Sequence, residues 1–109
     1  MVKRNIEQIK KEVVDRLLVL DPKQIILFGS FAYGTPTETS DLDICIVKET
    51  LSHRYDETVK ARELLKDIDI EKDIIMETES FLKEHSGNEW INTAWYDITH
   101  DGEVLYEKR

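Results

Sequence analysis

Several features that mark other protein classes are scarce in this chain of 109 residues. Its one cysteine, Cys45, cannot form a disulfide within the chain, which agrees with a reducing compartment. No apolar run approaches the length that spans a bilayer, so we expect no membrane association. An amphipathic segment, and not an apolar block, follows the basic N-terminal residues. We therefore expect no signal peptide and a cytoplasmic location.

Basic residues are also fewer than acidic ones. The chain has 15 basic and 23 acidic residues, for a formal net charge of −8. Binding to a phosphate backbone needs a basic face, so this balance argues against direct binding of nucleic acid. Two readings stay open: the acidic surface could bind a basic protein partner, or it could simply keep a small domain soluble.

Length and composition favour one compact unit. A length of 109 residues fits a single domain over residues 1–109, and a hydrophobic content of 40% is enough for one core. Periodicity and turn residues predict an α/β (α+β) fold, a mixed β-sheet covered by helices in the order αββαβααβ. The expected elements are a helix from Ile6 to Leu20, a strand over Gln24–Phe28, a loop over 31–40, a strand over Leu42–Val47, a helix over Leu51–Lys66, a strand over Ile68–Met76, helices after Thr78 and after Asn88, and an edge strand over Val104–Tyr106.

Several side chains are suited to cap the expected helices. Ser52, Thr78 and Asn88 each precede a predicted helix and are residue types that accept hydrogen bonds from its first amides. The apolar side of the last predicted helix includes Trp90 and Trp95. We expect both tryptophans in the core, although they could also form a partner surface or a homodimer surface.

The main candidate for a functional site is a pair of aspartates at the start of the second predicted strand. Alternate strand residues point to the same face, so Asp41 and Asp43 project together. Two neighbouring carboxylates repel each other, and Mg²⁺ turns such a pair into an oxygen-ligand site suited to substrate phosphates. By the same alternation Cys45 and Val47 share the aspartates' face, whereas the opposite face, which we expect in a core, carries Leu42, Ile44 and Ile46.

A phosphate-binding loop is predicted just before this pair. Gly29 and Ser30 follow the first apolar strand. Glycine lets a phosphate approach the backbone because no Cβ intervenes, and the serine hydroxyl can donate to phosphate oxygens. A helical turn opening at Phe31 would add backbone amides to this loop.

A third carboxylate is expected from a neighbouring strand. Asp73 is preferred because apolar residues follow it within the third predicted strand. Asp69 and Glu71 have the same parity, so pattern alone leaves all three acids open. The alternative for each of these acids is that it simply lies on a solvent-exposed face of the strand and has no role in the site.

Gly29-Ser30, ten further residues and then Asp41-Leu42-Asp43 form a signature with fixed spacing. It resembles that of the DNA polymerase beta-like nucleotidyltransferases, in particular the minimal nucleotidyltransferases, which are stand-alone domains of this size. The resemblance implies that Gly29 and Ser30 hold the triphosphate of a nucleotide, ATP in the first place. It implies that Asp41, Asp43 and Asp73 bind two Mg²⁺ ions and are the catalytic residues of nucleotidyl transfer to a hydroxyl.

The resemblance also implies a partner. Minimal nucleotidyltransferases of this type pair with helical toxins of the HEPN type and act as antitoxins, and some transfer AMP to a tyrosine of the toxin. One position departs from the family pattern, because Tyr33 stands where many relatives have arginine. Loss of the guanidinium removes a bidentate phosphate contact. The competing hypothesis is therefore a non-catalytic module that binds nucleotide and neutralises its partner by binding.

Other chemistries fit the sequence less well. The glycine spacing of a P-loop is present, but Thr35 occupies the place of its lysine. In phosphatases of the haloacid dehalogenase type the strand precedes the first aspartate, whereas here it follows. Cys45 is expected as a small buried residue and not as a nucleophile. The three histidines lack zinc-ligand spacing, and we expect them on the surface: His53, His85 and His100.

Overall fold

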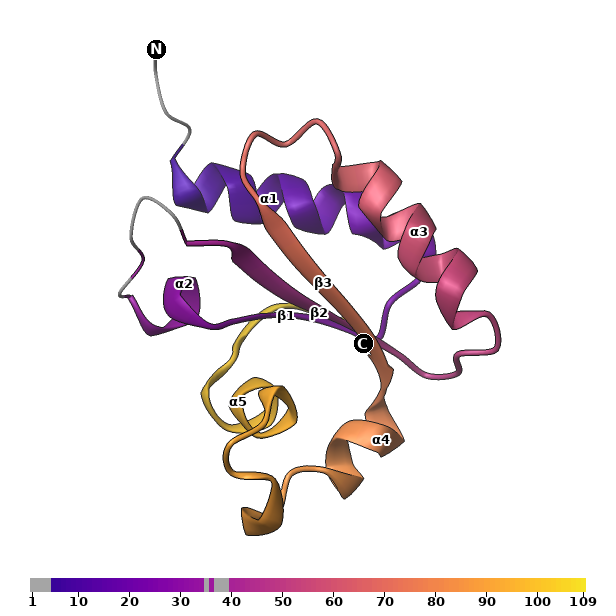
Figure 1. Ribbon diagram of the computed structural model, residues 1–109. Coiled ribbons are helices and arrows are strands. Elements are labelled where there is room, and N and C mark those ends of the chain that lie inside the picture. Colours follow the sequence, from indigo (N-terminus) through magenta and orange to yellow (C-terminus); the bar gives the residue numbers. More distant parts are fainter. Residues whose placement is uncertain (1–4, 35, 37–39) are drawn as a thin grey trace.

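The computed structural model describes residues 5–34, 36 and 40–109 as four strands and the helices that connect them (Figure 1). In chain order the elements are α1 (Ile6–Leu17), the 3-10 turn η1 (Leu18–Leu20), β1 (Gln24–Phe28), α2 (Ser30–Tyr33), β2 (Leu42–Lys48), α3 (Arg54–Leu65), β3 (Lys72–Thr78), α4 (Glu79–Glu84), the 3-10 turn η2 (Asn88–Trp90), α5 (Ala94–Asp101) and β4 (Glu103–Glu107). The predicted α+β order is confirmed, with the short α2 added inside the segment expected to be a loop.

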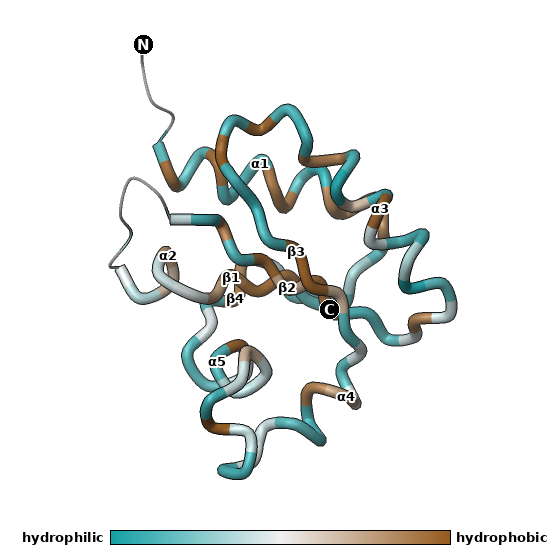
Figure 2. Tube along the Cα trace, viewed as in Figure 1, coloured by the Kyte–Doolittle hydropathy of each residue, from teal (hydrophilic) through white to brown (hydrophobic). Residues whose placement is uncertain are grey.

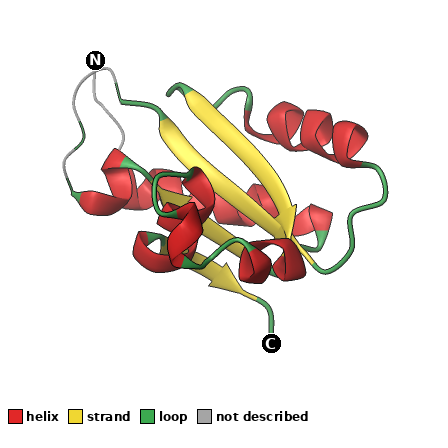
Figure 3. Cartoon of the chain, turned by 60° about the horizontal axis from the view of Figure 1, so that its bottom comes forward, coloured by secondary structure: helices red, strands yellow, loops and turns green. Residues whose placement is uncertain are grey.

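The four strands form one mixed sheet in the order β3-β2-β1-β4. β1 is antiparallel to both β2 and β4, whereas β2 and β3 are parallel. Parallel neighbours need a crossover connection, and α3 supplies it between β2 and β3. β3 and β4 therefore form the two edges of the sheet (Figure 3).

The helices cover the sheet in two layers (Figure 1). α1 and α3 lie on one face, and α4 and α5 lie on the other. The short α2 follows the end of β1, and its Phe31 and Ala32 pack against the cluster beneath α1 and α3. The apolar residues concentrate along the strands and on the inner sides of the helices (Figure 2). β2 is buried on both faces, as expected for a central strand, and its side chains divide between two hydrophobic clusters.

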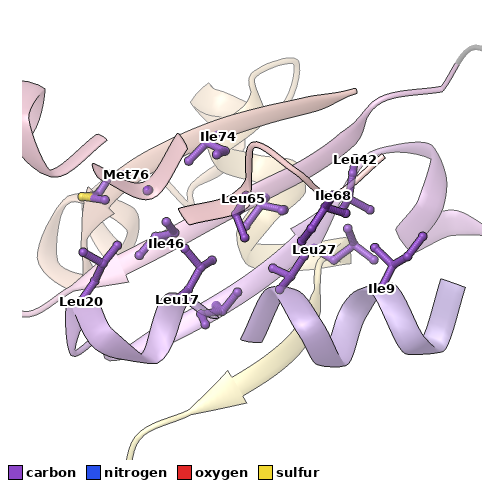
Figure 4. Packing of buried hydrophobic residues seen from close by; sticks show 14 residues of the cluster. Ile9, Leu17, Leu20, Leu27, Leu42, Ile46, Leu65, Ile68, Ile74 and Met76 are labelled. Carbon is purple, nitrogen blue, oxygen red and sulfur yellow. The ribbon is translucent and has the colours of Figure 1, made fainter. Parts of the chain in front are cut away.

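The predicted alternation along β2 is confirmed. Leu42, Ile44 and Ile46 belong to the larger cluster beneath α1 and α3 (Figure 4). Cys45 and Val47 belong to the smaller cluster, which Leu82 of α4 and Ile98 of α5 complete. Asp43 lies on the same face of β2 as Cys45 and Val47 and is half-buried.

α1 shows how local sequence produces the first helix. Asn5 accepts a hydrogen bond from the Glu7 amide at 2.7 Å, and the Gln8 side chain accepts one from the Asn5 amide, forming a capping box. Ile9 and Val13 point into the core from the same side of the helix, as the predicted periodicity required. The last predicted turn of this helix is η1, which ends at Leu20.

The predicted starts of α3 and β3 are wrong. Ser52 does not cap α3, which begins at Arg54 after His53 without a side-chain cap. β3 begins at Lys72 and not at Ile68, because residues 66–70 form turns and bends. The Lys72 ammonium donates to the carbonyls of Ile68 and Ile70, at 2.7 Å each, and holds those turns in place.

The helix predicted after Asn88 is interrupted. Asn88 begins only the turn η2, and Thr93 caps α5 by accepting a hydrogen bond from the Tyr96 amide. The Thr93 hydroxyl also donates to the Trp90 carbonyl at 2.7 Å, which fixes the break between the two pieces. Trp95 packs against the smaller cluster, as expected, while Trp90 is half-buried against the ring of His85. By contrast, Thr78 caps α4 as predicted.

No helix among the described residues is long and apolar enough to cross a membrane.

Burial makes Cys45 a reporter of global unfolding. The side chain is fully buried, and desolvation, together with the charge of Glu77, raises the pKa of its thiol to about 12. We expect a thiol reagent such as DTNB to leave the native protein unmodified at pH 8, and to react at once in denaturing urea. Rapid modification under native conditions would contradict the placement of Cys45 between β2 and the α4–α5 layer.

Candidate functional site

The parallel pairing of β2 with β3 places two carboxylates side by side. Asp43 is the direct partner of Asp73 in the register, and on its other side Asp43 pairs with Phe28 at the end of β1. Adjacent strands lie about 4.8 Å apart, and paired residues point to the same face. Asp43 is half-buried, and Asp73 and Asp41 are exposed. The predicted juxtaposition of Asp43 with an acid of the third strand is thus observed.

Like charge and burial act together on Asp43. Desolvation is the main cause that raises the pKa of its carboxyl, and the negative charges of Asp73 and Asp41 raise it further. Asp73 and Asp41 therefore both lie within electrostatic range of Asp43. Within the described residues none of them forms an ion pair.

The structure also distinguishes among the acids that the sequence left open. Asp69 and Glu71 precede β3, which begins at Lys72. The Glu71 carbonyl accepts a hydrogen bond from the Leu42 amide at 2.8 Å, just before the paired strands begin. Of the three alternatives, Asp73 is the one that the register places beside Asp43.

Gly29 brings the backbone of the loop directly against Asp43. Its φ of +75° lies in the region that favours glycine, and a Cβ at this position would lie 2.2 Å from the Asp43 Oδ2 atom. Its carbonyl accepts hydrogen bonds from the amides of Ala32 and Tyr33, which start α2 as one tight turn. Ser30 is the first residue of α2 and is half-buried. The first amides of such a turn have no partner within it. Gly29, Ser30 and Asp43 therefore form one contiguous surface.

Tyr33 lies beside α5. Burial raises the pKa of its phenol, and so do the charges of Asp97 and Asp101 and a hydrogen bond to Asp97. The phenol thus stays protonated over the physiological pH range. Asp97 and Asp101 were not among the predicted site residues. Their spacing of four on a helix places them on one face, but nothing in the sequence indicates which loop that face meets.

The carboxylates do not form a closed metal cage. Across residues 5–34, 36 and 40–109, no group of three or more Asp, Glu, His or Cys side chains is arranged to hold a metal ion. The donors nevertheless suit Mg²⁺ in kind, because they are hard carboxylate oxygens. Mg²⁺ is usually held by one or two carboxylates that share it with substrate phosphates and water. The neighbouring pair Asp43 and Asp73 is of that kind, and Asp41 lies just before β2, within electrostatic range of Asp43.

Two glycines with positive φ allow the contact at Gly29 to be tested. Gly29 has φ of +75° with ψ of −159°, a conformation almost restricted to glycine, and a Cβ there would displace the Asp43 carboxylate. Gly34 has the same φ with ψ of 19°, the ordinary left-handed region, and a Cβ there would meet no described atom within 4 Å. We expect Gly34→Ala to cost about 1–2 kcal/mol of folding free energy from backbone strain, and Gly29→Ala to cost more, from greater strain and from the contact with Asp43. Urea unfolding of both variants measures the difference, and a loss in Gly29→Ala no larger than in Gly34→Ala would contradict this placement of the loop.

The raised pKa of Asp43 gives a pH dependence with a defined sign. Folding raises this pKa above the ordinary value of 3.8, so the folded chain binds the proton more tightly and ionised Asp43 destabilises it. The destabilisation is fully present above the folded pKa and vanishes below the unfolded one. We expect Asp43→Asn to raise the melting temperature at pH 7 without divalent cations, and this gain to shrink as the pH falls toward 3.8.

Two comparisons accompany that measurement. Mg²⁺ should raise the melting temperature of the wild-type chain more than that of Asp43→Asn. Asp69→Asn serves as the matched control, because this exposed acid precedes β3. A melting temperature lowered by Asp43→Asn at pH 7 would contradict the electrostatic crowding.

Comparison with known proteins identifies the family. The family model described as nucleotidyltransferase domain matches residues 6–96, which include Gly29, Ser30, Asp41, Asp43 and Asp73. No curated protein matches the chain.

Three solved structures share the fold. A toxin–antitoxin with AMP-PNP is 24% identical, with a TM-score of 0.59 over 92% of this chain and 74% of the other. A MntA–HpeT toxin–antitoxin, in a mutant with glutamate replacing two aspartates two residues apart, is 20% identical, with a TM-score of 0.54 over 97% and 76%. A tri-AMPylated Shewanella oneidensis HEPN toxin in complex with MNT antitoxin contains a chain that is 19% identical, with a TM-score of 0.54 over 94% and 72%.

At these identities the structures show the common fold. The family model spans most of the sequence, including β1, α2, β2 and β3 with their loop and carboxylates. This chain therefore belongs to the nucleotidyltransferase domain family.

Proposed function

We propose that this chain is a Mg²⁺-dependent nucleotidyltransferase that moves AMP from ATP to the hydroxyl of a tyrosine in a helical HEPN-type toxin. The chain would then act as the antitoxin of that partner. The observation that carries the proposal is the alignment of Asp43 with Asp73 on one face, directly against the backbone at Gly29. Two similar structures support the nucleotide and the acceptor, since one contains AMP-PNP and the other an AMPylated HEPN toxin in complex with its antitoxin.

The site residues divide the work of the transfer. Gly29 leaves room for the triphosphate to lie against the loop, and the Ser30 hydroxyl donates to a phosphate oxygen. Asp41 and Asp43 would hold Mg²⁺, and Asp73 would complete the site. The mutated aspartates of the MntA–HpeT structure have the same spacing as Asp41 and Asp43.

The reaction forms one bond and breaks one. The acceptor oxygen bonds to the α-phosphorus of ATP, and the bond from that phosphorus to the bridging oxygen breaks to release pyrophosphate. Asp73 is exposed beside Asp43 and accepts the proton of the hydroxyl. Bound Mg²⁺ would neutralise the charge that develops on the attacking and leaving oxygens.

A second function is favoured by one specific observation. Tyr33 contacts the carboxylates of α5 and supplies no cation to the phosphate loop. A chain without that guanidinium could bind nucleotide, and neutralise its partner by binding alone, without turnover. The two functions differ in what happens when the carboxylates are neutralised. Binding alone should survive the loss of Asp41 and Asp43, whereas inhibition through AMP transfer should not.

Label transfer decides between the two. The purified chain is incubated with Mg²⁺, α-labelled ATP and a co-encoded helical protein, beside the double variant Asp41→Asn/Asp43→Asn. We expect label on the partner with the wild-type chain and none with the double variant. Asp73→Asn should slow the transfer by about 100-fold or more, since it removes the proton acceptor, whereas Asp69→Asn should have little effect.

Each alternative result has a defined meaning. A stable complex without label would reject the transferase for that acceptor and favour the binding module. Equal losses in Asp73→Asn and Asp69→Asn would instead reject the assignment of Asp73. Folding of each variant is checked by its melting temperature before the rates are compared.

A further inference from the structure

The outer side of β3 exposes backbone groups next to the candidate site. β3 is an edge strand that is bonded to β2 alone. In a parallel pair, alternate residues direct both their N–H and C=O groups to the same neighbour. Because the Glu71 carbonyl accepts from the Leu42 amide, Asp73 also bonds toward β2. Lys72 and Ile74 therefore direct their N–H and C=O groups away from the sheet.

One end of this edge is closed. The Arg54 guanidinium donates to the Met76 carbonyl, which by the same alternation also faces outward, and it pairs with the buried Glu77 carboxylate. Within the described part of the chain, no other group hydrogen-bonds the outward amides and carbonyls of Lys72 and Ile74. The free edge is thus short, and it flanks Asp73 on both sides.

A cavity of about 690 Å³ lies beside this edge. Arg62 of α3 and Lys66, directly after that helix, form one side, and β3 contributes Lys72 and Ile74. The remaining wall is the segment 67–71, which adds three acidic residues and two isoleucines. The cavity therefore offers charged side chains of both signs around a small apolar area, beside the free backbone hydrogen-bonding groups of the edge.

We propose that this edge, together with the cavity, binds an extended segment of the acceptor protein as an added antiparallel strand whose hydroxyl-bearing residue lies opposite Asp73. The proposal rests on the proposed function and names how its acceptor is held. Strand addition to an exposed edge obtains affinity from main-chain hydrogen bonds and specificity from pockets for alternate side chains.

The geometry at Asp73 is what makes the edge suitable for an acceptor. Because Asp73 bonds toward β2, the residue opposite it on an added strand forms a non-hydrogen-bonded pair, with Cα atoms about 4.5 Å apart. Its side chain projects on the face that carries Asp73 and Asp43. The residues on either side of it face the cavity near Ile70 and Ile74. The acceptor segment should therefore carry its hydroxyl between two side chains that fit a cavity lined mainly by charged groups.

A second copy of this chain fits the edge poorly. Arg54 blocks Met76, so two copies of β3 could pair antiparallel only about Asp73, with Lys72 opposite Ile74 of the other copy. That pairing places the two Asp73 carboxylates directly opposite each other, and like charges in that position are destabilising. The acceptor protein is the occupant that avoids this repulsion.

Two substitutions at one position isolate the outward amide. Lys72→Pro and Lys72→Ala both lose the side-chain bonds to the turn segment, but only proline lacks the N–H. Proline is tolerated at the first residue of an edge strand, and here it removes no bond to β2. We expect the KM for the acceptor to be about fivefold or more higher in Lys72→Pro than in Lys72→Ala, with the same KM for ATP in both.

Hydrogen exchange supplies a readout that needs no turnover. The probe is the co-encoded helical protein of the transfer assay, and exchange is measured for the free chain and for the complex. In the complex, the amides of Lys72 and Ile74 should exchange at least about tenfold more slowly than in the free chain. The exchange rate of the Asp73 amide, which is already bonded to β2, should not change.

The results separate this proposal from the proposed function. Label transfer with unchanged exchange at Lys72 and Ile74, or equal acceptor KM values in the two variants, overturns strand addition and leaves the transferase intact. Protection of the two amides without label supports the docking site and rejects the chemistry. Absence of any complex, or protection confined to β4, overturns the docking site.

Discussion

The parallel pairing of β2 with β3 is the constraint on which the rest of this molecule depends. It sets Asp43 beside Asp73 and, through the alternation of side chains, sends Leu42, Ile44 and Ile46 into the core beneath α1 and α3. A shift of one residue in this register would exchange the two faces of β3 and bury a charge. The hydrophobic core and the candidate site are therefore specified by the same set of hydrogen bonds.

That shared register has an electrostatic consequence. Asp43 is held partly buried between two other carboxylates, so burial and like charge raise its pKa and ionisation opposes folding. The cores on both sides of β2 offset this opposition, because fully buried aliphatic side chains contribute about 1.5–3 kcal/mol each. A bound cation would convert the same crowding into affinity. The crowding at Asp43 thus costs local stability, and the proposed metal-dependent reaction gives a reason for that cost.

Much of this arrangement follows from residue pattern alone. β1 was predictable because its apolar run is short, rich in isoleucine and bounded by Pro22 and Gly29, and the faces of β2 were predictable because strand side chains alternate. The choice of Asp73 over Asp69 or Glu71 does not follow from pattern, because it depends on where β3 begins, and the pairing of β3 with β2 decides that, together with the local bonds of the Lys72 side chain to the Ile68 and Ile70 carbonyls. The interaction of Tyr33 with Asp97 was not predictable from the sequence either, since α2 and α5 come together only in the folded chain. Thr35 and residues 37–39, which complete the predicted loop, lie outside the described residues.

β3 also shows how the fold separates a structural carboxylate from a candidate catalytic one. Asp73 and Glu77 lie on the same face of the strand, four residues apart. Glu77 is 2% exposed and pairs with Arg54 at the start of α3, so its charge is neutralised within the chain. Asp73 is exposed and has no ion-pair partner among the described residues. Both acids follow the same sequence alternation, but the charge of Glu77 is paired within the chain, whereas Asp73 is exposed beside Asp43, where the metal ion and the acceptor of the proposed reaction could reach it.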